Sequence, residues 1–437
     1  MSNFSEILQY ARSLDIIDTH EHLPPEEDWA AGKDDVLTEW LSHYFSCDLV
    51  SAGLSQRDLA TVVRDSSRPI EKRWKLVEPF WDAARHTGYA RALDIAARDL
   101  YGLARVDGDT IAELDKEFRK RREAAGRGQS HYEYVLKKKS RVAVSLVDAL
   151  METQRPADKK FFRPVYRIDP FLKLPDPVAR ENASREFGIR VHTLEDWKHA
   201  LETGIERALA GGAVALKCAV AYERSLSFAK VAAARAEEAF NALAAIPSGP
   251  DAGTVYGAAT LMEMSKTFGD HVMHHALKVA DEKGLTVQVH TGLQEGNGNI
   301  LENSHPALLT NLLLEYRNVT FDLFHMSYPY QNVLAALAKN FPNVMIDMCW
   351  AHIISPEASV RALVEFLDSV PANKISAFGG DYLFVDGVYG HQYLAREDVS
   401  RALAIKVEEG VFDIDRAKEI CRWLFVDNPK RIFRLDI

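Results

Sequence analysis

The chain has 437 residues, of which 47% are hydrophobic and 27% are charged, a balance typical of a globular protein rather than a disordered one. At ordinary domain sizes this length allows two or three domains, although an α/β barrel often uses about 250 residues or more as one unit. The formal net charge of −10 argues against nucleic acid and against an anionic membrane surface as partners.

Eight short apolar runs, rich in Val, Ile and Phe, predict strands that are buried on both faces. In chain order they cover residues 14–19, 142–147, 162–168, 213–216, 285–289, 319–324, 344–348 and 375–378. Helical patterns lie between them, most clearly at residues 229–245, 268–283 and 329–340. Strands that alternate with helices in this way predict an α/β fold, the (β/α)8 TIM barrel, in which the carboxyl ends of the strands line the active site.

Residues 25–140 separate the first two predicted strands, which is far longer than an ordinary barrel connection. Aromatic residues at helical spacing, among them Trp40, Tyr44 and Trp81, predict a large helical insertion after strand 1, packed over the barrel mouth. A smaller insertion surrounds the Pro/Gly-rich residues 246–253. We therefore expect residues 1–437 to form a single barrel domain that is enlarged mainly by the 25–140 insertion.

The first predicted strand ends in a His-x-His pair, His20 and His22. On a strand this spacing points both imidazoles to the same side, and neutral imidazole is a good ligand for zinc and related metals. Asp18 lies two residues earlier on the same face, where it could orient a ligand. The alternative is two polar residues at a strand end, but further histidines at later strand ends favour a metal pair.

Four later strands also end in residues that can carry chemistry: Lys217, His290, His325 and Asp381. The lysine is costly to bury unpaired, so it could be carbamylated and bridge two metals, bind an anion, form a Schiff base, or make a structural ion pair. Asp381 follows two glycines, which allow a close backbone approach, and its carboxylate suits a general base that takes a proton from bound water.

Candidate substrate contacts lie near the same strand ends: Arg167, Tyr222, Arg224 and Trp350. Either guanidinium could hold a substrate carboxylate in bidentate fashion, or could instead form a structural salt bridge. We expect His352 and His391 to be ordinary loop histidines at this face. The pair His274 and His275 lies in the middle of a predicted helix, where a structural role is expected.

Several common motifs are absent from the sequence. There is no Walker-type phosphate loop, no Gly-x-Gly-x-x-Gly after a strand and no Gly-x-Ser-x-Gly elbow, which argues against nucleotide-dependent and serine-nucleophile mechanisms. The four cysteines are widely spaced, so neither a disulfide framework nor a thiolate zinc site is indicated. No secretory signal is visible and no apolar run approaches the ~20 residues of a membrane span, so we expect a soluble cytoplasmic protein.

The motif Asp18-Thr-His20-Glu-His22, with the lysine, histidines and aspartate at the later strand ends, resembles the amidohydrolase superfamily of metal-dependent (β/α)8 barrels. The segments Ala-Leu-Lys-Cys-Ala-Val-Ala-Tyr, Val-Gln-Val-His-Thr-Gly and His-Met-Ser-Tyr-Pro-Tyr resemble its amidohydrolase-2 branch. That branch includes the domain fused to glutamine-synthetase-like proteins. The long aromatic insertion is also similar to that of the uronate isomerases.

This resemblance implies a metal site and the residues that form it. The implied metal ligands are His20, His22, His290 and Asp381. His325 would be a ligand of a second metal or a contact to substrate and transition state, and Lys217 matches the lysine that is carboxylated in two-metal members. Uronate isomerases are not expected to depend on such a lysine, so it counts against that activity.

We therefore expect a metal-dependent hydrolase that uses metal-activated water on a small amide, lactone or ester, one that carries a carboxylate. The catalytic residues would be Asp381 and His325, and the cofactor one or two divalent ions, zinc first and manganese second. The alternative activity is a uronate isomerase-like aldose–ketose isomerase, and a third is a barrel without catalysis that serves as an interaction domain. The partner is a small molecule, and the aromatic insertion offers an interface for a homo-oligomer.

Overall fold

Eight parallel strands follow one another in chain order in one sheet, and the fold is the predicted (β/α)8 barrel. The structure, a computed structural model, describes residues 2–149, 157–246 and 257–437. The strands are β1 (Ile16–Glu21), β2 (Val142–Val147), β3 (Phe162–Arg167), β4 (Ala215–Cys218), β5 (Thr286–Val289), β6 (Thr320–Leu323), β7 (Val344–Asp347) and β8 (Ile375–Ser376). Most of their side chains are buried, as expected for a sheet covered on both faces.

Most strands and helices lie within a few residues of their expected bounds. Lys217, expected at the end of its strand, lies one residue before that end, because β4 continues to Cys218. The helix expected at 268–283 is α14 (Ala258–Lys283), which begins ten residues earlier. Its first turns are mostly exposed, so they lack the apolar face by which a packed helix is detected in a sequence.

The chain divides into two compact units, each with its own strands. Unit 1 comprises residues 1–163, 293–299 and 346–437, and unit 2 comprises residues 164–292 and 300–345. Paired strands lie within each unit: β1 with β2 and β7 with β8 in unit 1, and β3 through β6 in unit 2. The single-domain organisation expected from the sequence stays a prediction.

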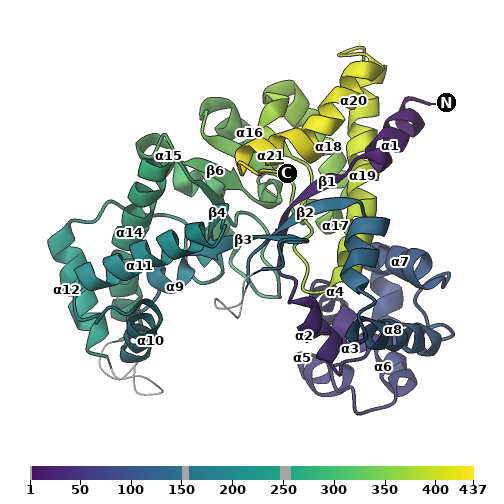
Figure 1. The fold of residues 1–437 in the computed structure, drawn as a ribbon, viewed down its shortest axis with the longest axis horizontal. Helices are drawn as coiled ribbons and strands as arrows, with labels where there is room; N and C mark the ends of the chain where they lie inside the picture. Colours follow the sequence, from purple (N-terminus) through teal and green to yellow (C-terminus); the bar gives the residue numbers. More distant parts are fainter. Residues whose placement is uncertain (1, 150–156, 247–256) are drawn as a thin grey trace. The chain divides into compact units, whose positions relative to one another are not determined.

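In unit 1 the segment between β1 and β2 is helical, as predicted. It forms α2 (Glu26–Ala31), α3 (Val36–Trp40), α4 (Phe45–Ser51), α5 (Gln56–Asp58), α6 (Ile70–Ala84), α7 (Gly88–Tyr101) and α8 (Ile111–Gly126), with π-helical turns at Leu59–Val63 and Glu133–Lys139. Figure 1 shows α2, α3, α6 and α8 gathered into one helical group. The aromatic side chains that predicted this insertion, Trp40, Trp74 and Trp81, are buried in its core.

A single buried carboxylate joins the insertion to α19 (Val385–Glu408). Asp386 accepts hydrogen bonds from the indole of Trp40 (3.2 Å) and the hydroxyl of Tyr101 (2.7 Å). It also lies 2.8 Å from Nε2 of His131. Burial raises the pKa of Asp386, but His131 and these donors outweigh it and hold the pKa below its ordinary value. The insertion is thus fixed to the helix that follows β8.

The other helices of unit 1 enclose its strands. They are α1 (Asn3–Ser13), α17 (Ala351–Ile354), α18 (Pro356–Ser369), α20 (Ile414–Arg422) and α21 (Asn428–Ile432). α1 and α18 both pack on α19. Glycines allow the closest approach: a Cβ on Gly390 of α19 would lie 2.0 Å from the carbonyl oxygen of Ala92 in α7.

Unit 2 carries its own set of helices around β3 to β6. They are α9 (Asp169–Leu172), α10 (Pro177–Phe187), α11 (Leu194–Ala210), α12 (Ala233–Ala244), α14, α15 (Thr310–Glu315) and α16 (Gln331–Asn340). α11 begins with a capping box between Thr193 and Asp196, and in Figure 1 it packs beside α12 and α14. The smaller insertion predicted at residues 246–253 lies, apart from Ile246, outside the described residues.

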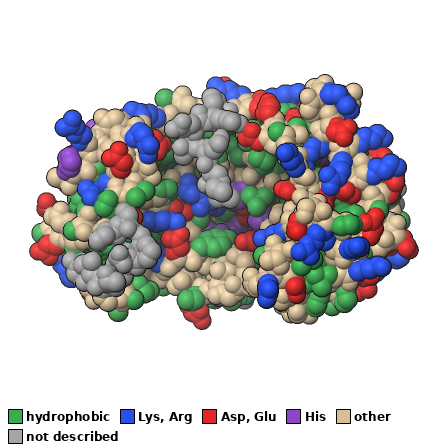
Figure 2. Space-filling model, turned by 90° about the horizontal axis from the view of Figure 1, so that it is seen from below, with side chains coloured by type: hydrophobic (Ala, Val, Ile, Leu, Met, Phe, Trp, Pro, Cys, Tyr) green, Lys and Arg blue, Asp and Glu red, His purple; other side chains and the backbone are tan. Residues whose placement is uncertain are grey.

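The described surface carries both signs of charge. On the face seen in Figure 2, lysine and arginine side chains are interspersed with aspartate and glutamate. Within the described part of the chain, no helix has the length and the apolar character that crossing a membrane requires.

Candidate active site

Three side chains of unit 1 converge at the ends of β1 and β8. Nε2 of His20 lies 3.4 Å from Oδ1 of Asp381, and Nε2 of His22 lies 3.2 Å from the same oxygen. All three side chains are at most 11% exposed. The structure therefore brings together the His-x-His pair and the final aspartate, which lie about 360 residues apart in the chain.

The hydrogen bond on the other nitrogen of His22 decides what its ring can bind. Nδ1 of His22 lies 2.8 Å from the carbonyl oxygen of Asp148, which can only accept, so Nδ1 donates. In the neutral ring Nε2 then presents a lone pair toward the carboxylate of Asp381. A cation placed between these two acceptors would satisfy both.

Asp148, which directly follows β2, is not among the site residues expected from the sequence. It fixes the tautomer of His22, and its carboxylate forms a possible ligand group with the two histidines, in which the ligand atoms lie within 4.8 Å of one another. A contact made by a backbone oxygen cannot be predicted from the residue type. The carboxylate of Asp148 at the end of a barrel strand is, however, a sequence signal by which this residue could have been selected.

Two buried carboxylates of β1 lie behind the histidines. Asp18 accepts hydrogen bonds from the hydroxyl of Ser145 (2.7 Å) and from the backbone of Gly380 (3.0 Å), so it ties β1 to β2 and to the loop after β8. Burial raises the pKa of Asp18 to about 6. Burial, with the neighbouring Asp18, raises the pKa of Glu21 well above its ordinary value, and Glu21 accepts a hydrogen bond from the backbone of Tyr382 (2.8 Å).

The glycines before Asp381 are needed for this packing, as the sequence indicated. A Cβ on Gly379 would lie 2.6 Å from Oγ1 of Thr19, and one on Gly380 would lie 1.8 Å from a carboxylate oxygen of Glu21. Asp381 itself has a φ of 60°, in the left-handed region that non-glycine residues rarely adopt outside functional sites.

The insertion adds two residues that the sequence reasoning did not select as site residues. The hydroxyl of Tyr44 donates to the backbone oxygen of Asp381 (2.6 Å), and the ring of Tyr44 stacks on Trp350 at 4.5 Å. His43 is 8% exposed, and its Nδ1 has no hydrogen-bond partner among the described residues. Burial lowers the pKa of His43 to about 3 despite the nearby Asp381, so the ring is neutral. The sequence carries no signal that His43 and Tyr44 belong to the site, because both lie within a long insertion and not at a strand end.

The polar loop after β5 also contacts the insertion. The backbone amide of Gly296 donates to the sulfur of Cys47 (3.3 Å), and the side-chain amide of Asn297 donates to the backbone oxygen of Cys47 (3.2 Å). Glu295 lies 3.8 Å from the same sulfur. These contacts fix residues 293–299 against α4.

Unit 2 holds the remaining predicted ligands. Nε2 of His325 lies 3.0 Å from Nδ1 of His290, and both rings are buried. Lys217 is 2% exposed, with its ammonium 3.5 Å from the centre of the Phe324 ring. His325 and the two residues after it all have positive φ, which marks a constrained strand end. The structure thus brings His290 and His325 together, and their role as ligands stays a prediction.

The predicted substrate contacts of unit 2 have different surroundings. Tyr222 packs on His290, with ring centres 4.7 Å apart, and is 40% exposed. Arg167 forms an ion pair with Asp169 (3.0 Å). Arg224 forms an ion pair with Asp270 of α14 and donates to the backbone oxygen of Ser227 (3.1 Å). Both guanidinium groups therefore have the structural ion pairs that were the alternative to substrate binding.

The expectation that His352 and His391 lie in loops is wrong. His352 is in α17, where its ring lies 3.1 Å from Asp398 and 2.9 Å from the backbone oxygen of Ala377. His391 is in α19, with Nδ1 3.1 Å from the backbone oxygen of Gly380. Both residues are fully buried.

A (β/α)8 barrel that places two histidines at the end of its first strand and an aspartate after its last has its candidate site where barrel enzymes have theirs, at the carboxyl ends of the strands. The family model for amidohydrolases matches residues 206–435, just over half of the chain, and the chain belongs to this family.

Individual proteins give a more distant likeness. The chain is 28% identical over 151 residues to the protein fluG of Emericella nidulans, a match that covers 34% of this chain but only 17% of that protein. It is similar to a uronate isomerase from Thermotoga maritima (TM-score 0.81, 17% identity, 99% of this chain and 97% of that chain). It is also similar to a glucuronate isomerase from Caulobacter crescentus, with a TM-score of 0.77, 18% identity and coverage of 100% of this chain and 94% of that chain. A putative metal-dependent hydrolase from Lactobacillus casei gives a TM-score of 0.64, 15% identity and coverage of 98% of this chain and 97% of that chain. At these identities the solved structures show the fold alone.

Proposed function

We propose that the protein is a metal-dependent hydrolase that cleaves a small amide, lactone or ester bearing a carboxylate. One observation carries the proposal: Nε2 of His20 and Nε2 of His22 both lie within 3.4 Å of the same carboxylate oxygen, Oδ1 of Asp381. Because Nδ1 of His22 is used as a donor to Asp148, the converging atoms form a set that suits a divalent cation.

The residues present fit such an ion. His20, His22 and Asp381 would hold it, and imidazole with carboxylate is a donor set that suits zinc first and manganese second. A bound divalent ion would lower the pKa of water toward 7 and polarise the substrate carbonyl. We further propose His290, His325 and a carboxylated Lys217 as additional ligands if two ions bind, as the family pattern implies.

In this reaction Asp381 would accept the proton of the attacking water and return it to the leaving group. The hydrogen bond from Tyr44 to its backbone and the packing of Gly380 on Glu21 hold the carboxylate in place. Nδ1 of His43, which has no hydrogen-bond partner among the described residues, would be available to substrate. Arg167, Tyr222, Arg224 and Trp350 stay candidate substrate contacts, with Arg224 available only if it leaves Asp270.

A panel of small amides, lactones and esters, with and without a carboxylate, tests the proposal on protein loaded with zinc or manganese. Asp381→Asn should lower kcat at least about a hundredfold, and the metal content of the same sample is measured beside it. Asp415→Asn alters an exposed carboxylate of α20 and should leave kcat unchanged. Full activity in Asp381→Asn with normal metal content would exclude the proposed role.

A second function is favoured by the insertion, which places His43 and Tyr44 beside Asp381. An aldose–ketose isomerase must move protons between neighbouring carbons of an intact sugar and needs such groups around one ion. Incubating the metal-loaded protein with uronic acids and following aldose and ketose signals by NMR distinguishes the two functions. Isomerisation without any hydrolysis of the panel would favour the isomerase.

Two expectations extend beyond the site. We propose a cytoplasmic location. We also propose a homo-oligomer that uses the aromatic-rich insertion as its interface, and a measurement of molecular mass in solution tests the oligomeric state.

A further inference from the structure

The peptide bond between Gly380 and Asp381 has a hydrogen bond at each of its polar atoms. Its amide donates to the backbone oxygen of His20 (2.8 Å). Its carbonyl oxygen lies 3.1 Å from Nδ1 of His391, on α19. A carbonyl oxygen can only accept a hydrogen bond, so Nδ1 of His391 is the donor. This histidine therefore holds the carbonyl end of the peptide bond that leads into Asp381.

The backbone conformation of Asp381 depends on the orientation of this peptide bond. The φ of Asp381 is 60°, a left-handed value that is unfavourable for a residue with a side chain, and the peptide bond forms one end of that torsion. Gly379 and Gly380 come directly before it, and glycine allows its peptide planes to turn at little cost. The glycines that let this loop approach β1 therefore also leave the peptide bond free to rotate unless a hydrogen bond holds it.

The ring of His391 is itself fixed by packing. The residue is fully buried, and the rings of Phe378 and Tyr382 meet it edge-on, with ring centres 5.0 Å and 6.3 Å away. A Cβ on Gly387, one turn earlier in α19, would lie 2.3 Å from the ring of Tyr382. The imidazole cannot turn without moving these neighbours, so α19 presents Nδ1 at a fixed point.

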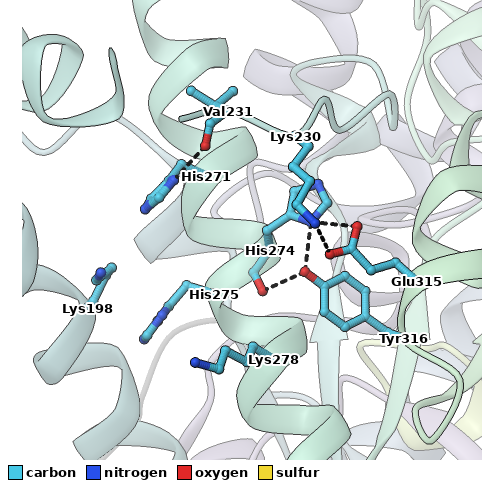
Figure 3. Close-up of a pocket in the computed structure, with 9 residues that line it drawn as sticks. All are labelled: Lys198, Lys230, Val231, His271, His274, His275, Lys278, Glu315 and Tyr316. Carbon is cyan, nitrogen blue, oxygen red and sulfur yellow. Dashed lines mark hydrogen bonds and ion pairs between the residues drawn. The ribbon is translucent and has the colours of Figure 1, made fainter. Parts of the chain in front are cut away.

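Histidines that line a pocket of about 350 Å³ in unit 2 make contacts of a different kind (Figure 3). Nδ1 of His274 lies 2.7 Å from the hydroxyl of Tyr316, which directly follows α15, and Nε2 of His275 lies 2.9 Å from Glu202 of α11. These contacts join α14 to the segments packed beside it. His391 differs from them because its partner is the backbone next to a candidate catalytic residue.

We propose that His391 is a positioning residue of the candidate site. It holds the peptide bond between Gly380 and Asp381 in the orientation that directs the Asp381 carboxylate toward His20 and His22. It acts through the backbone and not on the substrate. The inference rests on the proposed function, in which Asp381 accepts the proton, but the positioning can be measured without any activity.

Two substitutions of His391 separate the hydrogen bond from the packing. His391→Leu removes the donor and leaves an apolar side chain in the space. His391→Asn keeps a donor, since the amide nitrogen of asparagine takes a place close to that of Nδ1. Leu403→Ala is the control for a loss of packing, because Leu403 is a fully buried residue of the same helix about three turns further on.

Hydrogen–deuterium exchange of the backbone amides of Asp381 and Tyr382, followed by NMR on the whole protein, measures the positioning directly. His391→Leu should speed exchange at these amides about tenfold, as expected for the loss of one buried hydrogen bond. His391→Asn should restore most of the protection, and Leu403→Ala should stay within about twofold of the wild type. Unchanged exchange in His391→Leu, or equal acceleration in His391→Leu and Leu403→Ala, would overturn the proposal.

Kinetics with the best substrate of the amide, lactone and ester panel give the second measurement. His391→Leu should lower kcat about tenfold or more and change KM by less than about threefold, because Asp381 acts in the transition state. His391→Asn should recover most of kcat, and Leu403→Ala should retain it. An unchanged kcat in His391→Leu would overturn the proposal. If the panel yields no substrate, the proposed hydrolase fails, and the exchange rates alone still decide whether His391 holds Asp381.

Discussion

Nε2 of His22 lies 3.2 Å from Oδ1 of Asp381, although the hydrogen bond from Nδ1 to Asp148 leaves no proton on Nε2 of the neutral ring. Nε2 of His20 also approaches the same oxygen, at 3.4 Å. Two imidazole nitrogens and one carboxylate oxygen form a donor set that suits a divalent ion, and this convergence is the basis of the proposed metal centre.

The close approach of the loop after β8 to β1 predicts that Gly380→Ala is destabilising. The added Cβ would lie 1.8 Å from Oε1 of Glu21, whose carboxylate is held by the backbone of Tyr382. We expect a loss of about 1–3 kcal/mol in the free energy of unfolding, together with a fall in activity because Asp381 is the next residue. Gly126→Ala is the control in denaturant unfolding, since a Cβ there meets nothing within 4 Å. Equal stability of the two variants would contradict this packing.

The attachment of the insertion to α19 predicts a specific effect of Asp386→Asn. The amide keeps the shape but presents one oxygen to the three donors of Trp40, Tyr101 and His131. We expect a loss of about 1–3 kcal/mol in stability and faster proteolysis within residues 25–140. Asp415→Asn, which alters an exposed side chain, should show neither effect. An unchanged proteolysis pattern in Asp386→Asn would show that this carboxylate does not hold the insertion.

Glu39 of the insertion predicts a dependence of stability on pH. Burial raises the pKa of Glu39 from 4.5 to about 7, more than Arg122 and the indole of Trp29 lower it. Between these values the folded protein holds a proton that the unfolded chain releases, so this residue lowers the free energy of unfolding as pH rises from 4.5 to about 7. The Glu39→Gln variant has no group that titrates at this position. Its free energy of unfolding should therefore rise relative to that of the wild type as pH rises, by about 1.4 kcal/mol for each unit by which the pKa is raised.

Chemical denaturation at several pH values between 5 and about 8 measures this difference. Glu113→Gln changes an exposed side chain of α8, and its free energy of unfolding should change with pH as that of the wild type does. A constant difference between Glu39→Gln and the wild type across this range would show that Glu39 is ionised throughout.

The strand order and half of the site could be predicted because their signals are local. Buried parallel strands have a recognisable composition, and His20 and His22 lie at the end of the first such strand, while Asp381 lies after the last. His43 and Tyr44 could not be predicted, because an insertion brings them to Asp381 through long-range packing. The same holds for the role of Asp148, which acts through its backbone oxygen. The helical positions of His352 and His391 could not be predicted, because α17 has only four residues and α19 has buried side chains on all sides, so neither helix shows a distinct apolar face.

The metal content of the purified protein tests the central claim most directly. Elemental analysis should find at least one zinc or manganese ion per chain after exposure to these metals and removal of the excess. His22→Ala should lose that ion, while His199→Ala, which removes an exposed histidine of α11, should retain it. A wild-type protein that binds no divalent ion, or a His22→Ala variant that binds as much as the wild type, would contradict the account.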